Sequence, residues 1–64
     1  MTQQEIVDFM VNSVNQDNRL FAKQAGLSEA QIEESIIQSQ QTIQIMMQNI
    51  CGKLIQLGVI QVPR

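Results

Sequence analysis

The sequence has 64 residues, which is the size of one small domain, and it contains no histidine and a single cysteine, Cys51. A disulfide within the chain and a zinc site built from Cys and His ligands are therefore excluded, so a partner chain is the remaining way to reinforce a small core. The formal net charge is −2 and only two residues are aromatic, which disfavours binding to nucleic acid or to an anionic membrane surface.

The chain also lacks the residue patterns of catalysis, membrane insertion and secretion. Without histidine or tyrosine, proton transfer near neutral pH would need a carboxylate or lysine in a buried pocket, so we expect no enzymatic activity, cofactor or metal. The most apolar stretch, residues 43–62, is interrupted by glutamines, an asparagine and a lysine, so we expect no membrane span. The start has no basic segment before an apolar run, and a lone cysteine suits a reducing compartment, so we expect a cytoplasmic protein.

A first helix is predicted over residues 3–25. Thr2 and Glu5 have the spacing of a capping box, in which each side chain accepts a hydrogen bond from the other residue's backbone N–H. Gly26 can adopt the left-handed conformation that ends helices. One face of this helix, at about 100° per residue, carries the apolar residues Ile6, Met10, Val14, Phe21 and Ala25. A break at residues 15–18 is the alternative, because consecutive polar residues of modest helix propensity occur there.

A turn, a second helix and a tail are predicted at residues 26–28, 29–57 and 58–64. Ser28 and Gln31 form another capping-box pattern, which indicates where the second helix begins. Gly58 is expected to end this helix, and Pro63 in the tail prevents its extension. The second helix is therefore the longer of the two, roughly 43 Å against 34 Å at ~1.5 Å per residue.

The second helix carries a broad apolar stripe. Its central positions recur every seven residues, with further apolar residues beside them: Ile36, Ile43, Ile50 and Leu57, flanked by Ile32, Met47 and Leu54. A second flank about 80–120° away from this seam contains Ile37, Cys51 and Ile55. Because one antiparallel neighbour cannot cover both surfaces, we expect another chain to cover the remainder.

These features predict an all-α helical hairpin that pairs into a dimeric four-helix bundle, as one domain spanning residues 1–64. The expected function is a non-enzymatic protein–protein interaction, with the chain acting as a self-associating adaptor or regulator. A homodimer is the expected assembly, and a different protein on the same surface is the alternative. The predicted interface comprises Ile36, Ile43, Met47, Ile50, Leu54 and Leu57, with Ile37 and Ile55 as the second flank.

Another functional class is indicated by residues 21–32, which resemble the turn of a helix-turn-helix. Ala22, Gly26 and Ile32 occupy the small, turn and buried positions of that motif. The resemblance implies DNA binding or transcriptional regulation, provided that the first helix breaks ahead of Gly26. It departs from the motif in charge, because Glu29 and Glu33 open the helix that would face DNA, where cationic side chains are usual. DNA binding is therefore the alternative function.

Overall fold

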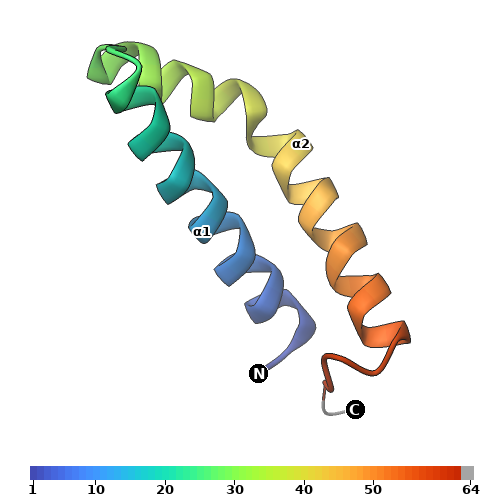
Figure 1. Ribbon diagram of the computed structural model, residues 1–64. Helices are drawn as coiled ribbons and strands as arrows, with labels where there is room; N and C mark the ends of the chain where they lie inside the picture. Colours follow the sequence, from blue (N-terminus) through green and yellow to red (C-terminus); the bar gives the residue numbers. More distant parts are fainter. Residues whose placement is uncertain (63–64) are drawn as a thin grey trace.

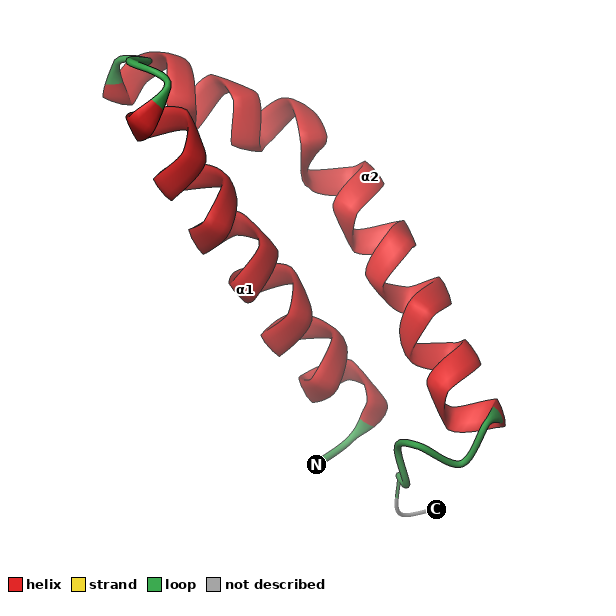
Figure 2. Cartoon of the chain, in the orientation of Figure 1, coloured by secondary structure: helices red, strands yellow, loops and turns green. Residues whose placement is uncertain are grey.

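The structure is a computed structural model that describes residues 1–62, and it forms a hairpin of two antiparallel helices (Figure 1). Helix α1 comprises Gln3–Gln24 and helix α2 comprises Glu29–Gln56, joined by a short turn. Helices and connecting segments account for the whole described chain (Figure 2), which is elongated, with extents of 43 × 18 × 17 Å. The predicted all-α hairpin is confirmed, and each helix ends one residue before its predicted limit.

Both helices begin with the expected capping boxes. The Thr2 hydroxyl accepts a hydrogen bond from the Glu5 backbone N–H at 3.2 Å, and the Glu5 carboxylate accepts one from the Thr2 N–H at 3.1 Å. Hydrogen bonding of the Glu5 carboxylate to the backbone N–H of Thr2, and then to its side chain, holds the pKa of the Glu5 carboxyl below its usual value. Ser28 and Gln31 make the same reciprocal pair at 3.2 and 2.9 Å. Each box satisfies two backbone donors that would otherwise lack partners at the helix start.

Both helices end in the same way, at a glycine with a positive φ. Gly26 has φ 87° and Gly58 has φ 78°, values that side chains with a Cβ rarely adopt. At each end the glycine N–H and the next N–H turn back to carbonyls of the last helical turn, as in the Leu27 to Ala22 bond of 3.1 Å and the Val59 to Leu54 bond of 3.0 Å. The glycines thus stop both helices. Pro63, predicted to prevent extension of α2, lies outside the described residues.

The core of the hairpin lies in the half nearest the open end, between the N-terminal part of α1 and the C-terminal half of α2. Its buried residues are Val7 and Val11 of α1 with Ile43, Met47 and Cys51 of α2. Half-buried residues pack around this cluster: Ile6, Met10, Val14 and Ile55. Val7 and Cys51 are almost completely buried, so the centre of the contact between the two helices lies here.

Helix α1 runs without interruption through residues 15–18, so the alternative of a break there is wrong. A modest propensity cost per polar residue is outweighed because helix on both sides keeps the backbone groups paired. The polar segment instead changes the packing between the helices. Asn15 is half-buried, and its side-chain oxygen is buried and has no hydrogen-bond partner among the described residues.

Beyond this polar segment, the turn end of the hairpin has little core. Ile32 is buried there, but Phe21 is 64% exposed and Ala25 is exposed, so the predicted apolar stripe of α1 is not covered by α2 along its whole length. An ion pair between Arg19 and Glu33 connects the helices across this end. The helices therefore pack through apolar side chains at one end and mainly through polar groups at the other.

Candidate protein-binding surface

The apolar residues of α2 lie on more than one side of the helix. Ile43, Met47 and Cys51 follow one another at intervals of four residues and face α1. Met46 and Ile50, each one position earlier, are large apolar residues that stay exposed, and so does Leu57. Ile50 is 40% exposed and Leu57 is 76% exposed, although the hairpin is folded. Helix α1 therefore covers only one side of the apolar surface of α2.

Two half-buried residues of α1 adjoin this surface. Ile6 and Met10 each precede an inward-facing valine, just as Met46 and Ile50 each precede an inward-facing residue of α2. Because the helices are antiparallel, positions that precede the inward ones lie on the same side of the hairpin in both helices. We call this composite surface the apolar face and define it as Ile6, Met10, Met46, Ile50 and Leu57.

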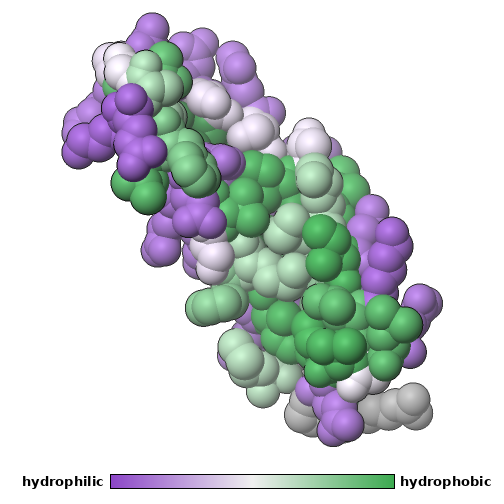
Figure 3. Space-filling view, viewed as in Figure 1, coloured by the Kyte–Doolittle hydropathy of each residue, from purple (hydrophilic) through white to green (hydrophobic). Residues whose placement is uncertain are grey.

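The apolar face lies in the half of the hairpin nearest its open end. Figure 3 shows hydrophobic side chains gathered over this half, whereas polar side chains dominate the half nearest the turn. Lys53 follows Met46 by seven residues and Ile50 by three, which places it at the outer edge of the same surface. A lysine at an edge can lay its methylene groups on apolar surface while its ammonium group stays in water. The face is thus apolar at its centre and polar at its margin, as protein interfaces are.

The structure distributes the predicted interface residues over three environments. Ile43 and Met47 belong to the core, Ile36 and Leu54 are half-buried, and Ile50 and Leu57 are exposed. On the predicted second flank, Ile37 is 67% exposed, but Ile55 packs against the core.

Cys51 and Ile55 are therefore misplaced by the prediction of an outer flank, since Cys51 is 0% exposed and Ile55 lies beside it. The buried residues Ile43, Met47 and Cys51 follow at intervals of four, so the inward side of α2 passes through Cys51 and leaves Ile50 exposed. The inward side of α2 therefore keeps Ile43 and Met47 of the predicted stripe and contains Cys51 in place of Ile50.

Val7 and Val11 are core residues that sequence reasoning missed. With Val14 they repeat at i, i+4 and i+7, which is a helical packing pattern, and this spacing could have identified them. The predicted apolar stripe of the first helix included Ile6, Met10 and Val14, which lie at the edge of the core.

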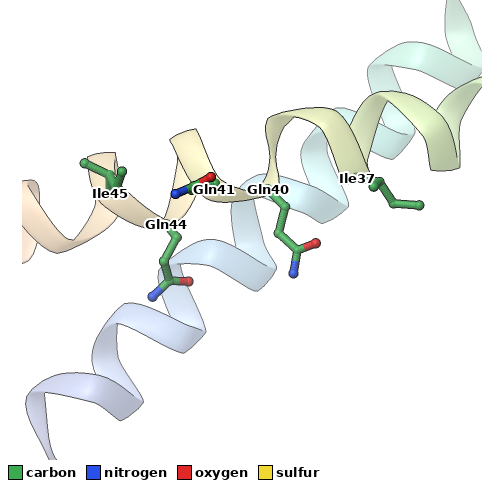
Figure 4. Close-up of a pocket in the computed structure, with 5 residues that line it drawn as sticks. All are labelled: Ile37, Gln40, Gln41, Gln44 and Ile45. Carbon is green, nitrogen blue, oxygen red and sulfur yellow. The ribbon is translucent and has the colours of Figure 1, made fainter.

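A separate hollow lies along α2, lined by Ile37, Gln40, Gln41, Gln44 and Ile45 (Figure 4). All five residues come from one helix, so the hollow is open to solvent and is not enclosed by a second element. Its lining offers amide groups and aliphatic carbon but no ionisable side chain. This arrangement supplies no group that could transfer a proton or act as a nucleophile.

The charged residues near the turn form structural contacts. The Arg19 guanidinium, which donates a hydrogen bond to Glu33, holds the pKa of that carboxyl below its usual value. The ion pair thus stabilises the fold above the carboxyl's unfolded pKa, and this contribution is lost as the pH falls through the lowered folded pKa. Both side chains are about half exposed, so the contribution is small. Within residues 1–62, no three His, Cys, Asp or Glu side chains are grouped closely enough to hold a metal ion.

Neither helix of the described chain has a segment both long enough and apolar enough to cross a membrane. In comparisons with known proteins, no family model, no curated protein and no solved structure matches this chain significantly.

Proposed function

We propose that this chain is a non-enzymatic module for protein–protein interaction, an adaptor or regulator that binds a partner through the apolar face. The observation that carries the proposal is the exposure of Met46, Ile50 and Leu57 on the side of α2 that α1 leaves uncovered. Large apolar side chains that are contiguous at a surface and are surrounded by polar residues are typical of binding sites.

The residue chemistry supports this proposal over catalysis. The Cys51 thiol is buried in the core, and there is no histidine in the chain to activate it. The apolar face itself contains aliphatic and thioether side chains, which bind by burial and packing. Methionines at two of its five positions suit a surface that adapts its shape to a partner.

DNA binding, the alternative function, depended on a break in the first helix, and α1 has no such break. A helix-turn-helix needs a short helix ahead of Gly26, but α1 is one continuous helix of 22 residues that packs antiparallel to α2. The charges at the start of α2 are also unfavourable for DNA, since Glu29 and Glu33 lie there.

Photo-crosslinking in cells that make this protein tests the proposed function. A photoreactive residue in place of Ile50 is expected to form a covalent adduct with protein, because that position faces the partner. The same residue in place of Gln41, an exposed position on the opposite side of α2, serves as the matched control and should give no adduct. Adducts are detected by denaturing electrophoresis and identified by mass spectrometry. Absence of any protein adduct at position 50, or equal adducts at both positions, would contradict the proposal.

A further inference from the structure

The surface area of the chain is large for its mass. The hairpin exposes 5047 Å², whereas a compact folded monomer of 7.2 kDa exposes about 4,100 Å² on the usual scaling with mass. The excess is about 900 Å², and a stable interface of standard size covers about 800 Å² on each partner. The excess surface of this elongated hairpin is therefore close to the area that one partner of a standard interface loses.

We propose that a second copy of this chain covers the apolar face, so that two hairpins pack face to face around a two-fold axis; this inference rests on the proposed function and names its partner. A two-fold interface brings one surface against itself, which requires the surface to be self-complementary. The apolar face meets this requirement at its centre, because its five residues carry no charge, and the one lysine beside them, Lys53, lies at its outer edge. A partner recognised by charge would be expected to meet the turn end, where Arg19, Lys23 and the glutamates lie.

The position of the core supports the same occupant. The buried cluster lies in the open half of the hairpin, directly beneath the apolar face, and it contains only five residues. Packing a second hairpin on this face would bury Ile6 and Met10 together with Met46 and Ile50. The small cores of the two hairpins would then form one continuous core among four helices. A fold with a core this small gains stability when it associates with a partner. A second copy of the same chain is present wherever the chain is made.

In such a dimer both helices contribute to the interface, so Ile6 and Met10 of α1 contact the second copy as well as the residues of α2. The test measures molar mass by light scattering over a dilution series, with helicity followed by circular dichroism on the same samples. The wild-type chain should have twice its sequence mass and should dissociate on dilution. Ile50→Ala and Met10→Ala should each raise the dissociation constant about tenfold or more, because a two-fold interface loses each contact twice.

Matched variants on the other sides of the same helices serve as controls. Ile37→Ala in α2 and Phe9→Ala in α1 remove side chains that are 67% exposed and lie outside the apolar face, so both should leave the dissociation constant unchanged. A dimer that is weakened by the control variants and not by Ile50→Ala or Met10→Ala would overturn the inference. A chain that stays monomeric at every concentration would overturn it too, and the proposed function would still stand if position 50 crosslinks to a different protein.

Discussion

Replacing Ile43 by aspartate is expected to abolish the helical fold. Ile43 lies in the buried cluster with Val11 and Met47, so the new carboxylate would lose its hydration without gaining a partner. Such a cost amounts to several kcal/mol, whereas small domains have a total stability of only about 5–15 kcal/mol. Circular dichroism at 222 nm and urea unfolding measure the effect.

Ile37→Asp is the matched control, because it introduces the same charge in the same helix at a position that is largely exposed. This variant should have the helicity of the wild-type chain. Its free energy of unfolding should differ from that of the wild-type chain by no more than about 0.5 kcal/mol. Equal loss of structure in both variants would mean that the inward side of α2 is assigned to the wrong residues.

A proline at position 16 should destabilise the chain almost as strongly, because α1 is continuous there. Gln16 is exposed, so the substitution leaves the core untouched and acts only on the backbone. Proline in a helix interior removes one hydrogen bond and clashes with the preceding turn, which costs about 3 kcal/mol or more. Thermal unfolding followed by circular dichroism measures the loss.

The control for this variant is Gln3→Pro, since proline at the first position of a helix removes no internal hydrogen bond. It should unfold at nearly the wild-type temperature. If Gln16→Pro were tolerated as well as Gln3→Pro, α1 would have to be broken within residues 15–18, as the polar sequence there first suggests.

The limits of the two helices could be predicted because they are set by local chemistry. Thr2 with Glu5 and Ser28 with Gln31 mark the two starts, and a glycine with positive φ follows each end. These signals involve residues within one helical turn of one another, so no knowledge of the tertiary fold is needed to interpret them.

The side of α2 that faces α1 could not be predicted in the same way. Apolar residues from Met46 round to Ile55 occupy roughly half of the circumference of the helix, so several sides satisfy the heptad pattern equally well. Which side turns inward is decided by fit against the other helix, where Cys51 is buried in one cluster with Val7 and Val11 while Ile50 stays exposed. The helical periodicity of α2 alone does not predict which of its sides packs against α1.

The exposed part of the candidate surface was predicted only in part for the same reason. Ile50 and Leu57 were included in the predicted interface, whereas Met46 of α2 and Ile6 and Met10 of α1 were not. Recognition of a surface built from two helices requires the orientation of both, which follows from the packing of Val7 against α2 and not from the pattern of either helix.

On this proposal the apolar face, and no other side of the hairpin, contacts a second copy of the chain. NMR spectra of methyl-labelled protein, recorded over a range of concentrations, test this claim residue by residue. Concentration-dependent shifts are expected for the methyl groups of Ile6, Met10, Met46, Ile50 and Leu57, with unchanged signals for Ile37 and Ile45. Shifts concentrated at Ile37 and Ile45, with the apolar face unaffected, would contradict it.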